Sequence, residues 1–460
     1  MGIRFGTDGW RAVIAEEFTF ENVRRVTRAV HETMPASKGA VVVGHDTRFH
    51  SARFAREAAR VLASAGRKVL LTDAPCPTPS VSCQVAGTGA PFGMSITASH
   101  NPPEFNGVKI KSSSGASASP EVTRQVEALL SRVSGEAAPE SEEISLTSFE
   151  AEHRRRLLSM VDLDRIRKAG LRVVFDAMHG AAGRMLARLL DGGATSVETL
   201  HGDPDPLFGG INPEPIESNL PALRERMARG GASVGLATDG DADRIGAYDE
   251  KGRFVSPLRI TPLLAVGLLK RGKRGEICKT FANTILLDRI AARNGCPFSV
   301  HPIGFKYIAE RMAGPEFLIG GEESGGIGIQ GYLPERDGLL ISLLILETMA
   351  SEGKGLAELL AEMEEDYGAF AYARRDIPCP SEKGVALAAA LKQRLPSKVG
   401  RMKVTGMDDL DGVKLLFGEE GWILARASGT EPVLRVYCEA PTQEDVAAAL
   451  DDLIARVTGA

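Results

Sequence analysis

Residues 40–71 read AVVVGHDTRFHSARFAREAARVLASAGRKVLL. The apolar run at 40–44 predicts a buried strand, the pattern at 51–65 predicts a helix, and the run at 68–71 predicts a second buried strand. Because strands and helices that alternate in this way are typical of α/β proteins, the stretch indicates a parallel α/β sheet.

The same scheme is repeated along the chain. A second α/β unit begins at Leu171 and a third at Pro257, which indicates one duplicated architecture. Short strands between 414 and 437 favour an antiparallel C-terminal part. The acidic, serine-rich segment 134–148 has little to bury and is interpreted as a linker or surface excursion. We predict an α/β fold of four domains, at residues 1–150, 151–252, 253–367 and 368–460.

The composition is that of an ordinary soluble protein, and the charge balance favours a small substrate. The 460 residues include 55 basic and 60 acidic side chains, and the net charge of −5 offers no footprint for nucleic acid or an anionic membrane. The apolar runs are shorter than the roughly 18 residues of a membrane span. Six cysteines occur without a CxxC pair, which predicts neither a disulfide framework nor a zinc site and favours a cytoplasmic location.

A serine lies in a stretch that can continue neither as strand nor as helix. Residues 97–103 read Thr-Ala-Ser-His-Asn-Pro-Pro and follow an apolar strand predicted at 92–96. The two prolines lack N–H donors and restrict the residues before them, so Ser99 is placed on a turn. From these residues alone, an exposed nucleophile and an ordinary Ser/Asn turn both remain open.

Three aspartates alternate in the segment Asp239-Gly240-Asp241-Ala242-Asp243. Carboxylates so close together repel one another unless a cation lies between them, and their hard oxygens suit Mg2+. The EF-hand is a competing template, but its sixth position requires glycine and here holds Arg244. A solvated acidic hairpin is the other alternative.

Three further loops have residue types suited to anions or sugars. The N-terminal segment 4–11 ends in Arg11 and could meet an anion. Residues 320–326, Gly-Gly-Glu-Glu-Ser-Gly-Gly, could grip sugar hydroxyls, and residues 426–432, Arg-Ala-Ser-Gly-Thr-Glu-Pro, could bind a phosphate. Each could also be a plain turn.

Taken together, these motifs resemble the α-D-phosphohexomutase family, specifically its phosphoglucomutase and phosphomannomutase members. Four signatures occur in family order over the whole chain: Thr-Ala-Ser-His-Asn-Pro, Asp-Gly-Asp-Ala-Asp-Arg, Gly-Glu-Glu-Ser-Gly-Gly and Arg-Ala-Ser-Gly-Thr-Glu-Pro. The resemblance implies three similar mixed α/β domains and a smaller C-terminal α+β domain like the TATA-binding protein, arranged around a central cleft.

The resemblance also implies roles for individual residues. Ser99 would be the phosphoserine, with His100, Lys109, Arg11 and Arg244 around the reacting phosphate and Lys109 as a proposed proton-transfer residue. Magnesium would be held by Asp239, Asp241, Asp243 and an oxygen of the phosphate on Ser99. The substrate would be bound at the sugar by Lys306, Glu322 and Ser324, and at its other phosphate by Arg426, Ser428, Gly429, Thr430 and Arg435.

The implied reaction interconverts hexose 1-phosphates and hexose 6-phosphates. Phospho-Ser99 would give its phosphoryl group to the sugar, and the resulting hexose 1,6-bisphosphate, which also serves as activator, would turn around and return its other phosphoryl group. Ala427 and Ala12 depart from common family residues without removing a functional group. Glu323 stands where glucosamine-phosphate mutases usually have glutamine, and it favours glucose, with mannose close behind.

Three alternatives compete with this hypothesis. A phosphoglucosamine mutase would share every motif except the residue at position 323. A metal-dependent sugar phosphatase also uses aspartate-rich loops, but its nucleophile is usually a carboxylate. A sugar-phosphate sensor without catalysis would not need all the reactive groups, whereas this chain has every one of them.

Overall fold

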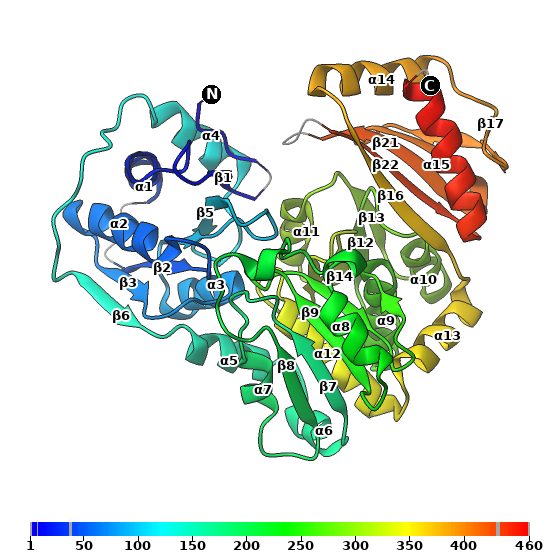
Figure 1. Ribbon diagram of the computed structural model, residues 1–460, viewed down its shortest axis with the longest axis horizontal. Helices are drawn as coiled ribbons and strands as arrows, with labels where there is room; N and C mark the ends of the chain where they lie inside the picture. Colours follow the sequence, from blue (N-terminus) through cyan, green and yellow to red (C-terminus); the bar gives the residue numbers. More distant parts are fainter. Residues whose placement is uncertain (1, 7, 36–38, 429–432, 459–460) are drawn as a thin grey trace. The chain divides into compact units, whose positions relative to one another are not determined.

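The computed structural model describes residues 2–6, 8–35, 39–428 and 433–458 (Figure 1). Contacts divide the chain into two compact units. The first unit comprises residues 1–276 and 304–360, and the second comprises residues 277–303 and 361–460.

The first unit begins with a six-stranded mixed sheet of order β1-β5-β4-β2-β3-β6. β2 runs parallel to β3 and β4, and β3 runs parallel to β6, whereas β5 is antiparallel to both β4 and β1. The strands are β1 (Trp10–Val13), β2 (Val41–His45), β3 (Val69–Thr72), β4 (Phe92–Ile96), β5 (Phe105–Ser112) and β6 (Ile144–Thr147). The helices are α1 (Phe20–Thr33), α2 (Ser51–Ser64), α3 (Thr78–Thr88) and α4 (Pro120–Leu129).

The strand–helix–strand prediction for residues 40–71 is confirmed, because β2, α2 and β3 each begin and end within one residue of the predicted bounds. The interpretation of residues 134–148 as a linker or surface excursion is wrong at its end, where β6 forms at the edge of the sheet. An edge strand has one neighbour and needs no apolar run, and the side chain of Leu146 is accordingly exposed.

The second sheet has the order β11-β10-β9-β7-β8. β7 is parallel to β8 and β9, and β9 and β10 form an antiparallel pair joined by residues 239–244. The strands are β7 (Arg172–Asp176), β8 (Ser196–Leu200), β9 (Val234–Thr238), β10 (Ile245–Tyr248) and β11 (Phe254–Val255). The helices are α5 (Glu150–Leu158), α6 (Leu163–Lys168), α7 (Met185–Leu190) and α8 (Pro221–Ala228), with short 3-10 turns η1 (Phe208–Gly210) and η2 (Glu217–Asn219).

The rest of the first unit includes α12 (Gly338–Glu352), which is buried from Gly338 to Met349 and packs against α6, β9, β10 and α9 (Pro257–Lys270). Asp337 caps its N-terminus, where its Oδ1 accepts hydrogen bonds from the N–H groups of Leu339 and Leu340. The other elements of this part are α11 (Phe305–Met312) and the antiparallel hairpin of β14 (Phe317–Gly321) and β15 (Ile327–Ile329), and α13 (Leu356–Tyr367) begins in the first unit and ends in the second.

The second unit is built around a five-stranded sheet of order β16-β22-β21-β20-β19. Every neighbouring pair is antiparallel, as the sequence predicts. The strands are β16 (Ala371–Pro378), β19 (Gly406–Asp408), β20 (Val413–Leu416), β21 (Trp422–Ala427) and β22 (Val433–Ala440). The remaining elements are α10 (Leu286–Asn294), α14 (Ser381–Gln393), α15 (Gln443–Thr458), η3 (Gly418–Glu420), the parallel pair β12 (Glu276–Thr280) and β13 (Phe298–His301), and the short pair β17 (Lys398–Val399) and β18 (Met402–Lys403).

A lysine is buried inside this second unit. The Nζ of Lys414 donates a 2.6 Å hydrogen bond to the carbonyl oxygen of Phe281 and lies 4.0 Å from the centre of the Trp422 ring. Burial, and then the charge of Lys279, lowers the pKa of Lys414 to about 7. The side chain of Lys414 therefore links β20 to the residues that follow β12. Its ammonium group is easily deprotonated.

The stability of the second unit should depend on the charge of Lys414. Unfolding restores the ordinary pKa of about 10.4, so between pH 7 and 10 the unfolded chain binds more protons and the free energy of unfolding rises with pH. Between pH 7 and 9, we expect wild type to gain about 2 kcal/mol over Lys414→Met in denaturant unfolding. Lys398→Met, at an exposed position, should follow wild type, and parallel pH profiles for wild type and Lys414→Met would contradict the prediction.

Candidate active site

Ser99 is held in a left-handed backbone conformation just beyond the end of β4. Its φ is +52°, a region that costs non-glycine residues free energy and that must be fixed by the surrounding structure. The N–H of Ser99 donates to the Oγ1 of Thr97 at 2.9 Å. The turn predicted for residues 97–103 therefore exists, and the serine within it is fully buried.

The hydroxyl of Ser99 points at the aspartate segment. Its Oγ donates to the Oδ2 of Asp239 at 2.8 Å and lies 3.3 Å from the Nδ1 of His100. Burial, and then the charges of Asp243 and Asp241, raises the pKa of Asp239. Burial and the nearby cations, Arg244 first among them, lower the pKa of His100. The serine thus lies between a carboxylate and an imidazole that favours its neutral form.

The aspartate segment makes a tight turn between β9 and β10. The Oδ1 of Asp239 accepts hydrogen bonds from the N–H groups of Asp243 and Arg244, and Ala242 takes a positive φ of +60°. Gly240 is required by close approach, because a Cβ there would lie 2.6 Å from the carbonyl oxygen of Ser99. The two loops therefore pack backbone against backbone, which brings the serine to the aspartates.

The three aspartates fit a hard divalent cation. Asp239, Asp241 and Asp243 are buried, and each offers a carboxylate oxygen within 4.8 Å of the other two. Within the described chain, the buried Oδ1 atoms of Asp241 and Asp243 accept no hydrogen bond. Buried anionic oxygens without donors are costly unless a cation binds them, and the donor set is of the kind that magnesium prefers.

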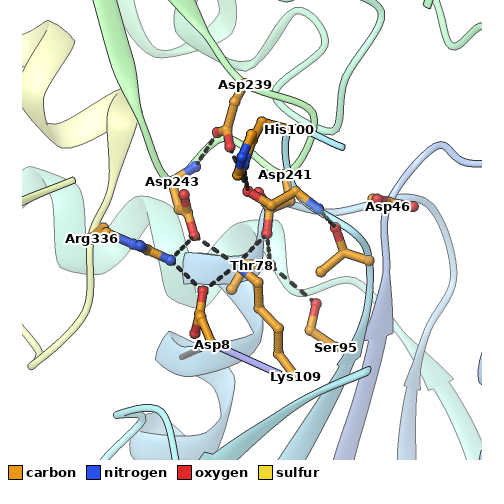
Figure 2. Close-up of polar contacts among 12 residues, drawn as sticks. Asp8, Asp46, Thr78, Ser95, His100, Lys109, Asp239, Asp241, Asp243 and Arg336 are labelled. Atoms are coloured by element: carbon orange, nitrogen blue, oxygen red, sulfur yellow. Dashed lines mark hydrogen bonds and ion pairs between the residues drawn. The ribbon is translucent and has the colours of Figure 1, made fainter. Parts of the chain in front are cut away.

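Lys109, on β5, balances the negative charge of this site. Its Nζ lies 2.8 Å from a carboxylate oxygen of Asp8, 2.9 Å from one of Asp241 and 2.8 Å from one of Asp243 (Figure 2). Burial would lower the pKa of Lys109, but the carboxylates outweigh it, and the pKa is raised. The ammonium group is therefore a fixed positive charge in this arrangement.

Arg336 is a functional residue that the sequence analysis missed. Its guanidinium group bonds Asp8 and the Oδ2 of Asp243, the latter at 2.6 Å (Figure 2). It also donates to the Oε2 of Glu322 at 3.0 Å. It thereby joins the aspartate segment to the predicted sugar-binding loop. The available signal was the charged run Glu335-Arg336-Asp337 just before the apolar helix α12, since charges that precede a buried helix need buried partners.

The other predicted residues of the first unit differ in how they are connected to the aspartates. Arg11 donates to the Oδ1 of Asn101 at 2.7 Å, and the guanidinium group of Arg244 lies 3.9 Å from a carboxylate oxygen of Asp243 and 3.9 Å from one of Glu214. Ser324 is in the turn between β14 and β15, and Lys306 is in the first turn of α11. Among the described residues, no hydrogen bond or ion pair joins Ser324 or Lys306 to the aspartates.

The predicted phosphate-binding residues belong to the second unit. Arg426 on β21 and Arg435 on β22 are directly paired in register. The Nε of Arg426 donates to Asp411 at 2.8 Å, and the Nε of Arg435 lies 3.5 Å from Asp376. The side chain of Ser428 is buried at the end of β21. Gly429 and Thr430 lie outside the described residues. The two arginines thus occupy paired positions on neighbouring strands, and each lies against a carboxylate of its own.

Four family models match the chain in sequence order. They are described as phosphoglucomutase/phosphomannomutase α/β/α domain I, domain II, domain III and C-terminal domain, and they match residues 2–136, 151–252, 257–367 and 379–457. Together with the fold, these matches define an isomerase of the α-D-phosphohexomutase class.

Individual relatives lead to the same assignment. A phosphoglucomutase/phosphomannomutase of Thermococcus kodakarensis is 33% identical over 96% of both chains, and a probable phosphoglucosamine mutase of Methanopyrus kandleri is 30% identical over 99% of this chain and 97% of its own. A crystal structure from Thermus thermophilus, described as a candidate phosphomannomutase, is 38% identical over all of both chains with a TM-score of 0.90. The chain belongs to the phosphoglucomutase/phosphomannomutase family.

These comparisons confirm the family resemblance, the enzyme class, and the composition of three mixed α/β domains with an antiparallel C-terminal domain. The domain boundaries and the roles of individual residues stay predictions. No helix within the described ranges is long and apolar enough to cross a membrane.

Removing one ligand should weaken binding of a divalent cation. In Asp241→Asn, loss of one anionic oxygen is expected to raise the Mg2+ concentration for half-maximal turnover by about tenfold or more, as measured by kinetic titration after chelation. Asp73→Asn, at an exposed carboxylate, is the control and should titrate like wild type. An unchanged Mg2+ requirement in Asp241→Asn would refute the metal site.

Proposed function

We propose that the protein interconverts hexose 1-phosphate and hexose 6-phosphate, with glucose and/or mannose as the sugar, through a phosphoserine at Ser99 and a hexose 1,6-bisphosphate intermediate. The observation that carries this proposal is the 2.8 Å hydrogen bond from the hydroxyl of Ser99 to Asp239, in a buried site with three clustered aspartates. A serine held there suits the repeated gain and loss of a phosphoryl group more than attack on a carbonyl carbon.

The chemistry is an exchange of phosphoryl groups between two oxygens. The bond between phosphorus and the Oγ of Ser99 breaks while phosphorus bonds to the free hydroxyl oxygen of the sugar. The sugar hydroxyl loses its proton, and the Oγ of Ser99 gains one. Magnesium held by Asp239, Asp241 and Asp243 would neutralise charge on the transferring group. The fixed charge of Lys109 and the guanidinium groups of Arg11 and Arg244 oppose the charge on its oxygens.

The remaining predicted residues orient the substrate. Glu322 would accept hydrogen bonds from sugar hydroxyls, and its carboxylate is held ready by Arg336 at 3.0 Å. Ser324 and Lys306 would contribute to the same sugar site, while Arg426, Ser428, Gly429, Thr430 and Arg435 would hold the phosphate that is not being transferred. We also propose a cytoplasmic setting, which the reduced thiols of the six cysteines support.

Ser99→Ala should abolish turnover, because no other group would carry the phosphoryl group. We expect a loss of about a thousandfold or more in kcat, with no phosphate incorporated on incubation with labelled hexose 1,6-bisphosphate. The matched control is Ser114→Ala, an exposed serine that should retain full activity and labelling. Intact turnover in Ser99→Ala would refute the phosphoserine mechanism.

The identity of the sugar rests on Glu323, which lies in the turn after β14. We propose a preference for glucose, then mannose, although several relatives are named as probable phosphoglucosamine mutases. The test compares kcat/KM for the 1-phosphates of glucose, mannose and glucosamine, primed with a hexose 1,6-bisphosphate. A preference for glucosamine would overturn the interpretation of Glu323, and net release of phosphate would favour a phosphatase.

A further inference from the structure

One arginine donates hydrogen bonds to several carbonyl groups of the segment that carries Ser99. Arg48 lies in the loop between β2 and α2, and its side chain is completely buried. Its Nη2 donates to the carbonyl oxygens of Ser99 at 2.7 Å and Asn101 at 2.6 Å, while its Nη1 donates to those of Pro102 at 2.8 Å and Phe105 at 3.0 Å. Four carbonyls from one seven-residue segment thus converge on one guanidinium group.

The guanidinium group is itself fixed from the other side. Its Nε lies 3.2 Å from the Oδ2 of Asp46, whose other oxygen accepts hydrogen bonds from the N–H of Arg48 at 3.0 Å and the Oγ of Ser51 at 2.7 Å. The guanidinium carbon also lies 4.9 Å from the centre of the Phe208 ring. Both charges of the pair are buried, so each needs the other to remain there.

Apart from the bonds to Arg48, residues 99–105 have few backbone hydrogen bonds, among them those from the N–H of Asn101 to the carbonyl of Ala98 and from the N–H of Phe105 to that of Pro102. Ser99 takes a left-handed conformation, and Pro102 and Pro103 have no N–H to donate. The segment between β4 and β5 turns its carbonyls inward, where each needs a donor. An arginine side chain offers five N–H groups in a planar fork and can bond several carbonyls at once.

The same segment also fixes Arg11. The carbonyl oxygen of Asn101 accepts from Arg48, while its side-chain Oδ1 accepts from the Nη1 of Arg11 at 2.7 Å. A shift of the backbone at Asn101 would therefore displace both the nucleophile and the arginine predicted to face the phosphate.

We propose that Arg48 is a positioning residue for phosphoryl transfer: by bonding four carbonyls of residues 99–105, it keeps the Oγ of Ser99 directed at Asp239. The proposal rests on the phosphoserine role proposed above for Ser99. Arg48 acts through the backbone and contacts Ser99 only at its carbonyl oxygen.

Arg48→Lys is the decisive variant. It keeps the positive charge opposite Asp46, but a single ammonium group cannot reproduce the fork that reaches four carbonyls. Since misplacement of a reacting atom by about 1 Å can cost about a hundredfold in rate, we expect kcat to fall by about ten- to a hundredfold with KM changed less than about threefold. A general loss of folded enzyme would instead lower the melting temperature and the active fraction.

The direct measurement is single-turnover transfer of labelled phosphate from Ser99 to glucose 1-phosphate. Wild type should transfer rapidly, and Arg48→Lys should transfer more slowly by the same factor as its kcat. The control is Arg25→Lys, which also removes an arginine bonded to a backbone carbonyl, that of Leu130 at 2.6 Å, and should transfer like wild type. Should Arg48→Lys fail to fold, Asp46→Asn, which keeps the carbonyl bonds but removes the charge that fixes the guanidinium group, should transfer more slowly than wild type with KM unchanged. Transfer as fast as in wild type would then overturn the positioning role.

The outcomes separate the two proposals. Failure of wild-type Ser99 to take up label would refute the proposed function. Normal labelling of wild type, with transfer equally fast in Arg48→Lys, would overturn the positioning role alone. If Arg25→Lys slows transfer as much as Arg48→Lys does, the effect is a general loss of stability and the positioning role is likewise refuted.

Discussion

The ammonium group of Lys109 is the charge on which the site depends. It comes from β5 of the first sheet and meets Asp241 and Asp243 from the hairpin of the second sheet, together with Asp8 from the N-terminal segment. Buried carboxylates in such number are unstable without buried cations, and the removal of a buried partner costs far more than the loss of a surface ion pair. Lys109 and Arg336 therefore allow two separate sheets to share one polar interior, and both cations bond aspartates of the cluster that fits a divalent cation.

Backbone geometry supplies the second constraint. Ser99 and Ala242 both take positive φ values, and Gly240 leaves room for the carbonyl oxygen of Ser99. Each of these features is unfavourable in isolation and is maintained by its neighbours. They occur where two loops meet, which is typical of sites that need one arrangement of reacting atoms. The hydrogen bonds from Arg48 are a further constraint of this kind. They satisfy carbonyl groups that would bond to a neighbouring strand if the segment were a regular strand.

Local patterns could predict the elements and the residue types of the site. The apolar runs of β2 and β3 and the helical spacing of α2 reflect burial against near neighbours, and they gave bounds correct to one residue. β6 was missed because pairing at a sheet edge leaves no apolar signature. Arg336 and Arg48 were missed for another reason: their partners lie 93 and 51 residues away, at Asp243 and Ser99, and are chosen by the tertiary fold. A sequence motif identifies a reactive group, but the groups that balance its charge or hold its backbone need no motif.

The left-handed turn at position 99 also limits which amino acid can serve there. Threonine offers the same kind of hydroxyl group as serine, and as an acceptor of phosphate the two are chemically close. A β-branched side chain, however, is strongly disfavoured at positive φ, because its second γ substituent crowds the backbone. The choice of serine is therefore made by the shape of the chain as well as by the reactivity of the hydroxyl, and chemical equivalence between two side chains does not make them interchangeable in this turn.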